Sequence, residues 1–215
     1  MKKVNGGKKK GVFILFEGPD RSGKTTQAKL LCDFLKKSGF KVLMTREPGG
    51  TDVGEKIREI LLDPSNKIFP LTELLLYEAS RAQHVFEKIK PAIDKGYIVI
   101  CDRFTIATMA YQGYGRKIEL KLVKDLNDIA TLGLKPDIIV GFKISDEEYE
   151  KRNRGDNDRI EQEDEDFRRR VNMGYSKIFS KTRDIVLIDA SKPIHKISEY
   201  IGKVVLKKVK CLLNL

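Results

Sequence analysis

Short apolar runs alternate with longer amphipathic segments along this chain, a pattern that is typical of an α/β protein. The apolar runs predict strands at residues 12–17, 42–45, 97–101, 138–142 and 185–188. Helical periodicity predicts helices at residues 26–37, 54–62, 71–94, 120–132, 146–152, 166–179 and 193–208. This alternation predicts a parallel sheet with helices on both faces. Ligands of such sheets bind at the carboxyl ends of the strands, so we expect the functional residues there.

The first strand is followed by a phosphate-loop signature. Residues 18–25 fit G-x-x-x-x-G-K-[ST], between an apolar run and a helix that begins near Thr25. We expect the loop N–H groups and the helix N-terminus to form an anion site, Lys24 to reach the β and γ phosphates, and Thr25 to bind Mg²⁺. A Gly-rich turn with an incidental lysine is the alternative, but the strand–loop–helix setting favours binding of a nucleoside triphosphate.

A second candidate group follows the strand at 97–101. Asp102 and Arg103 reach the same sheet edge as the phosphate loop. The carboxylate is suited to Mg²⁺, usually through a water, and the guanidinium to a phosphate. Alternatively Asp102 caps a following helix and Arg103 is a surface residue; the nearby phosphate loop favours the functional interpretation.

Two weaker signals involve aromatic side chains. Tyr77 and Arg81 are four residues apart and share one helix face, which is a workable grip for a nucleobase. The residues alone favour a core tyrosine and a solvated arginine. Tyr111 and Gln112 add a phenol and an amide near the edge that carries Asp102, and either could be structural.

The segment 151–159 is strongly charged, contains Gly155 and lacks apolar periodicity, so it predicts a mobile surface loop. Arginine-bearing loops of this kind close over phosphates. Residues 1–10 predict a flexible basic tail, and residues 11–215 a single domain.

The net charge of +11 suggests a nucleic-acid partner. Much of the excess, however, lies in the N-terminal tail and near the C-terminus, without interleaved aromatic residues, so we expect no nucleic-acid partner. The alternative function that is not enzymatic is a protein that binds nucleic acid in a nucleotide-dependent way. No apolar run approaches about 20 residues, and the first residues lack a signal-peptide core, so we expect no membrane association. Three well-separated cysteines favour a reducing, cytoplasmic location.

Several motifs together resemble those of thymidylate kinases in order and spacing. They are Phe16-Glu17-Gly18, the loop from Asp20 to Gln27, Arg46-Glu47-Pro48-Gly49-Gly50-Thr51, Asp102-Arg103-Phe104, Ala110-Tyr111-Gln112-Gly113 and Asp158-Arg159-Ile160-Glu161. The resemblance runs from about Val12 to the last strand. It implies transfer of the ATP γ-phosphoryl group to dTMP with Mg²⁺, a five-stranded P-loop nucleoside monophosphate kinase fold, a lid at about 151–162, and a homodimer.

The resemblance also implies roles for individual residues. Tyr77 stacks on thymine, Arg81 bonds a base carbonyl, and Tyr111 crowds the sugar 2′ position. The implied ATP-binding residues are Gly18, Pro19, Asp20, Arg21, Ser22, Gly23, Lys24, Thr25 and Thr26. The implied dTMP-binding residues are Asp20, Pro48, Arg58, Tyr77, Arg81, Arg103, Thr108, Tyr111 and Gln112, with Arg58 and Arg103 on the phosphate. The implied metal residues are Thr25 and Asp102, and the catalytic ones Asp20, Arg21, Lys24, Arg103, Arg152 and Arg154.

The chain departs from the usual family pattern near the base and in the loop. Ala107-Thr108 replaces a more usual serine or asparagine pair, which keeps a kinase for another nucleoside monophosphate, or for a nucleoside, as the alternative. The family divides into enzymes with a basic residue in the phosphate loop and enzymes with basic residues in the lid, and this chain has both. Because Arg21 is built into the loop, we expect it to be the main transition-state arginine and the lid arginines to assist closure.

Overall fold

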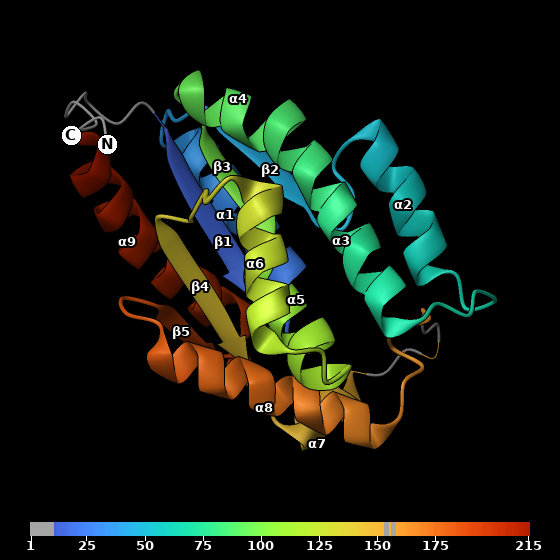
Figure 1. Ribbon diagram of the computed structural model, residues 1–215. Coiled ribbons are helices and arrows are strands. Elements are labelled where there is room, and N and C mark those ends of the chain that lie inside the picture. Colours follow the sequence, from blue (N-terminus) through green and yellow to red (C-terminus); the bar gives the residue numbers. More distant parts are fainter. Residues whose placement is uncertain (1–10, 153–154, 156–157) are drawn as a thin grey trace.

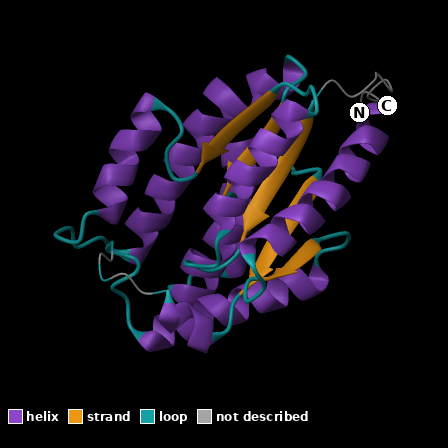
Figure 2. Cartoon of the chain, turned by 180° about the vertical axis from the view of Figure 1, so that it is seen from behind, coloured by secondary structure: helices purple, strands orange, loops and turns teal. Residues whose placement is uncertain are grey.

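The five apolar runs form one parallel sheet in the computed structural model, which describes residues 11–152, 155 and 158–215. The strands are β1 (Val12–Glu17), β2 (Val42–Arg46), β3 (Ile98–Asp102), β4 (Ile138–Lys143) and β5 (Val186–Asp189). Their order is β2-β3-β1-β4-β5, and all neighbours are parallel (Figures 1 and 2). The predicted fold class is confirmed, and each strand lies within one residue of its predicted bounds.

Helices cover both faces of the sheet. They are α1 (Lys24–Lys37), α2 (Asp52–Leu62), α3 (Pro70–His84), η1 (Val85–Ile89), α4 (Lys90–Asp94), α5 (Thr105–Thr108), η2 (Met109–Gly115), α6 (Leu120–Thr131), α7 (Asp146–Lys151), α8 (Glu165–Lys181) and α9 (Ile194–Leu213). The predicted helix at 71–94 corresponds to α3, η1 and α4 in succession, with η1 a π-helical turn. The sequence did not predict α5 and η2, because residues 105–115 lack a clear helical period and contain two glycines.

The core explains why the central strand reads as a continuous apolar run. All six residues of β1 are buried, as expected for a strand covered on both faces. Alternate residues such as Ile14 and Phe16 pack with α1 and α9, whereas Phe13 and Leu15 pack with η1 and α4. Helix α8 packs against η2 around a third apolar cluster. This packing fixes the loops at the carboxyl ends of the strands.

The strand order places the two strongest sequence motifs side by side. Because β3 is the neighbour of β1, Phe16 pairs with Asp102 in the sheet register, and the phosphate loop follows β1 directly. Gly18 is required at the start of this loop, since a Cβ there would lie 2.6 Å from the Phe142 carbonyl oxygen. Residues 1–10, predicted as a basic tail, are outside the described part of the chain. In that part, no helix is both long and apolar enough to cross a membrane.

Candidate active site

The phosphate loop wraps around its own lysine. Nζ of Lys24 donates hydrogen bonds to the Pro19 carbonyl oxygen (2.6 Å) and to Ser22 Oγ (3.4 Å). Burial and the nearby Arg103 together lower the pKa of Lys24 to about 8, against the opposing effect of the surrounding carboxylates. A polyphosphate in this loop would therefore favour the charged lysine.

Thr25 and Asp102 meet across the β1–β3 edge. Thr25 Oγ1 donates a hydrogen bond to Asp102 Oδ2. The other oxygen, Asp102 Oδ1, is buried and has no hydrogen-bond partner among the described residues. A buried oxygen of this kind calls for a cation or an ordered water. Oxygen ligands from a hydroxyl and a carboxylate beside a phosphate site fit Mg²⁺.

Arg103 connects the loop with the helices above it. It forms an ion pair with Asp20, and Tyr111 OH donates to the second oxygen of that carboxylate at 2.6 Å. Arg103 Nη1 also donates to the Gly18 carbonyl oxygen (3.2 Å) and to Tyr175 OH (3.0 Å). Burial opposes ionisation of Asp20, but Arg103 and Lys24 outweigh it and lower the pKa of the carboxyl.

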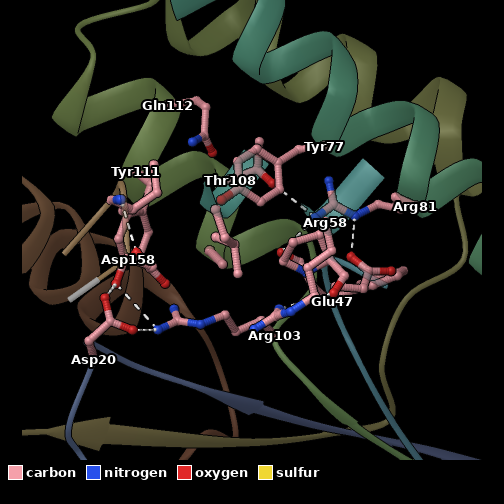
Figure 3. A pocket seen from close by; sticks show the side chains of 15 residues that line it. Asp20, Glu47, Arg58, Tyr77, Arg81, Arg103, Thr108, Tyr111, Gln112 and Asp158 are labelled. Carbon is pink, nitrogen blue, oxygen red and sulfur yellow. Dashed lines mark hydrogen bonds and ion pairs between the residues drawn. The ribbon is translucent and has the colours of Figure 1, made fainter. Parts of the chain in front are cut away.

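One cavity gathers every residue predicted to bind dTMP. Its lining includes Asp20, Pro48, Arg58, Tyr77, Arg81, Arg103, Thr108, Tyr111 and Gln112, together with Glu47, Leu62, Phe104, Ala107, Asp158 and Ile160. Figure 3 shows Gln112 and Tyr77 toward one end of this cavity and Asp20 and Arg103 toward the other. The arrangement combines an aromatic plane and polar groups at one end with the Arg103–Asp20 ion pair at the other.

A second, larger cavity continues from the first along the phosphate loop. Asp20 to Thr26 of the predicted ATP residues line it, whereas Gly18 and Pro19 do not. Gln27, Ala190, Lys192 and Ile194 extend the lining beyond the loop. The two cavities share a wall formed by Asp20, Glu47, Arg58, Arg103 and Asp158. Two ligands bound in them would therefore meet at Arg103 and Asp20.

Arg81 is not the solvated arginine that the residues alone favoured. It is buried, and its five N–H groups have protein acceptors. Nε donates to Glu47 (2.8 Å), Nη1 to Glu78 and Asn127 (2.8 and 2.9 Å), and Nη2 to the Phe104 carbonyl oxygen and Thr108 Oγ1 (3.0 and 2.9 Å). In this state Arg81 supports the cavity wall and orients the Thr108 hydroxyl.

Two carboxylates of the site, Glu47 and Glu17, belong to the quoted motifs but were given no role from the sequence. Glu47 binds both Arg81 and His84 Nδ1 (2.9 Å), a histidine to which the sequence assigned no role. Glu17 accepts the Phe104 and Ala107 N–H groups at the start of α5 (2.8 and 3.1 Å), and burial raises its pKa to about 7. Their position in the sequence could have identified them, because Glu17 ends β1 and Glu47 directly follows β2 at the sheet edge that carries the site.

The predicted lid is only partly within the described residues. Arg154, a predicted catalytic residue, lies outside them. Arg152 Nη1 donates to the Arg21 carbonyl oxygen (3.0 Å) and Nη2 to the Ala190 carbonyl oxygen (2.7 Å), while its Nε binds Glu148 (2.8 Å). The guanidinium of Arg21 lies 4.3 Å from the centre of the Tyr149 ring. Both arginines therefore connect the phosphate loop with α7.

The prediction of a surface loop was wrong for Arg159. Its side chain is buried, with Nη2 donating to Glu73 (2.7 Å) and Nε to the Leu61 carbonyl oxygen (2.7 Å). A charge-rich stretch was interpreted as solvated because its partners lie about 90 residues earlier in the chain, and local sequence does not identify them.

Known proteins resemble the chain over nearly its whole length. The sequence model of one family, described as thymidylate kinase, matches residues 16–201. The thymidylate kinase of Caldanaerobacter subterraneus subsp. tengcongensis is 50% identical over 198 residues, which cover 91% of this chain and 95% of that protein. The thymidylate kinase of Thermoanaerobacter pseudethanolicus is 48% identical over 92% of this chain and 98% of that protein.

A solved structure agrees with this result. The crystal structure of thymidylate kinase from Ehrlichia chaffeensis superposes with a TM-score of 0.75 at 35% identity, covering 91% of this chain and 98% of that one. The chain belongs to the thymidylate kinase family.

Proposed function

We propose that this protein transfers the γ-phosphoryl group of ATP to dTMP, giving dTDP and ADP. The observation that carries the proposal is the pair of adjoining cavities with Asp20 and Arg103 in their common wall. One holds the phosphate loop and suits ATP. The other offers the Tyr77 ring, polar groups and positive charge, which suit a nucleoside monophosphate.

The reaction requires alignment and neutralisation of charge more than covalent chemistry. Lys24 and Arg21 bind the donor phosphates, and Arg103 and Arg58 hold the acceptor phosphate, which is already ionised and needs no strong base. Asp20 orients Arg103, and Tyr111 faces the acceptor sugar. We assign the main transition-state charge to Arg21, with Arg152 and Arg154 assisting closure.

Thr25 and Asp102 would hold Mg²⁺, which neutralises phosphate charge when bound. Replacing Asp102 by asparagine is expected to raise the Mg²⁺ concentration for half-maximal activity about tenfold, since the amide keeps the shape but loses the charge. A Mg²⁺ titration of enzyme stripped with a chelator measures it. Asp125→Asn, in an exposed pair with Lys121, is the matched control and should not shift the titration. An unchanged Mg²⁺ requirement in Asp102→Asn would remove Asp102 from the metal site.

The substrate is tested by ADP release in a coupled assay with ATP, Mg²⁺ and dTMP, dUMP, UMP, dCMP or AMP. We expect dTMP to be the best acceptor by a wide margin. A kinase for another nucleoside monophosphate is the second candidate. Ala107 lines the cavity where a serine is more usual in the family, so this chain lacks a hydroxyl near the base. A higher kcat/KM for any other acceptor would establish that candidate and contradict ours.

We also propose a homodimer formed through α3. Leu71 and Leu75 on α3 and Phe86 on the following η1 are each about half exposed, which is unusual for large apolar side chains along one helical face. Leu75→Glu is expected to give monomers in sedimentation at micromolar concentration, because a charge would be buried in the interface. Met173→Glu on α8 is the control, and equal sedimentation of both variants as dimers would refute this interface.

The compartment that we propose is the cytoplasm. Cys32 and Cys101 are buried free thiols, and Cys211 is an exposed free thiol. Thiols in this state are typical of a reducing environment.

A further inference from the structure

The carboxylate of Glu73 on α3 is fully buried and binds side chains from two distant segments. Its Oε1 accepts hydrogen bonds from Gln112 Nε2 (2.8 Å) and Arg116 Nε (3.0 Å). Its Oε2 accepts from Arg116 Nη2 (2.9 Å) and Arg159 Nη2 (2.7 Å). One carboxylate thus holds η2 and the segment that carries Arg159.

These segments form two walls of the dTMP cavity. Gln112 lines the cavity itself. Arg159 lies between Asp158 and Ile160, which also line it. Glu73 is absent from the lining, so any influence on the bound base must act through these neighbours.

The chemistry of Glu73 determines which way the Gln112 amide faces. An ionised carboxylate only accepts hydrogen bonds, so Gln112 must direct its amide nitrogen to Glu73. Burial alone would raise the pKa of Glu73, but hydrogen bonds from Arg116, Gln112 and Arg159 outweigh it and lower the pKa, so the carboxylate stays ionised. With the amide nitrogen held at Glu73, the amide oxygen of Gln112 points away from Glu73, on the side of the cavity that this residue lines.

A hydrogen-bond acceptor at this position distinguishes pyrimidine bases by whether their N3 atom carries a hydrogen. Thymine and uracil carry a hydrogen on N3, whereas N3 of cytosine is itself an acceptor. Two acceptors facing each other in a buried site leave both unpaired, which is costly. The orientation of one amide therefore selects the base.

We propose that Glu73 is a positioning residue that determines base choice by fixing the amide of Gln112 with its oxygen toward the base. The proposal rests on the dTMP kinase function proposed above. It extends specificity to a group that does not touch the substrate and that also holds Arg159, a residue of the predicted lid.

Glu73→Gln tests the proposal. The single amide oxygen is expected to stay between the two arginines, where Oε2 now binds both guanidinium groups. The new amide nitrogen would then face Gln112, which turns its oxygen toward it and its nitrogen into the cavity. The ratio of kcat/KM for dTMP to that for dCMP should fall about ten- to a hundredfold.

This ratio distinguishes a positioning role of Glu73 from a general structural role, because a loss of folded enzyme lowers kcat/KM for dTMP and for dCMP by the same factor. Glu163→Gln is the matched control, since Glu163 also pairs with Arg116, at Nη2 (2.6 Å), whereas the amide of Gln112 donates to Glu73. Its ratio should equal that of the unmodified enzyme. In a Gln112→Ala background, Glu73→Gln should leave the ratio unchanged because the amide is missing.

Proportional losses for both substrates in Glu73→Gln would overturn the proposal. A changed ratio that persists in the Gln112→Ala background would also overturn it. If Glu73→Gln does not fold, Gln112→Ala alone tests the premise, because loss of the amide oxygen should lower the ratio. An unchanged ratio in Gln112→Ala would overturn the proposal. Failure of the dTMP kinase assignment is recognised separately, as an unmodified enzyme that does not prefer dTMP.

Discussion

Replacing Arg21 by methionine is expected to lower kcat about a thousandfold, close to 4 kcal/mol of transition-state stabilisation. Methionine keeps most of the length of the side chain and removes its charge. Arg21 lines the ATP cavity and not the dTMP cavity, so KM for dTMP should change little. Steady-state kinetics with varied ATP and dTMP measure both quantities.

Arg152→Met is the comparison for this prediction. The N–H groups of Arg152 are engaged by Glu148, by the Ala190 carbonyl oxygen and by the Arg21 carbonyl oxygen. Its loss should mainly loosen the contact between the phosphate loop and α7, with a fall in kcat of about tenfold. If Arg152→Met lowers kcat more than Arg21→Met, the roles of the two arginines are reversed.

Arg103→Lys is expected to lower kcat/KM for dTMP about a hundredfold. Arg103 holds Asp20, the Gly18 carbonyl oxygen and Tyr175 OH at the same time, and it lines both cavities. A lysine keeps the charge but lacks the planar set of donors, so it cannot hold these groups and a phosphate together. Most of the loss should therefore appear with dTMP as the varied substrate.

The matched control is Arg169→Lys on α8. Its side chain is 75% exposed and forms only a surface pair with Asp166 at 2.7 Å, so kcat/KM should stay within about twofold. Equal effects of the two substitutions would mean that the geometry of Arg103 is unimportant and that its charge alone is sufficient.

Local patterns determined the sheet and the ATP side of the site. The buried strands, the loop from Gly18 to Thr25 and the pair Asp102-Arg103 are contiguous in sequence, so each carries its own signal. In a parallel sheet the carboxyl ends of the strands lie at the same edge, so no further signal is needed to bring these residues together. The position of these residues around one edge was therefore predictable.

The dTMP side depended more on the resemblance than on the residues. Thr108, Tyr111 and Gln112 reach the cavity from α5 and η2, which the periodicity did not predict. A π-helical turn changes the angle between successive side chains, so a period of 3.6 residues does not describe it. The burial of Arg81 was equally hidden, because acceptors such as Glu47 and Asn127 lie 34 and 46 residues away.

The sequence by itself determined the fold class, the phosphate loop and the expectation of two nucleotide substrates. Only the tertiary structure decided which charged residues are solvated and which are buried in pairs. Glu73 is the clearest case, since its sequence setting is that of an ordinary helix and its partners lie 39, 43 and 86 residues away. The hydrophobic pattern of a sequence indicates which residues of one helix or strand are exposed. The partners of a buried charge depend instead on which elements pack together.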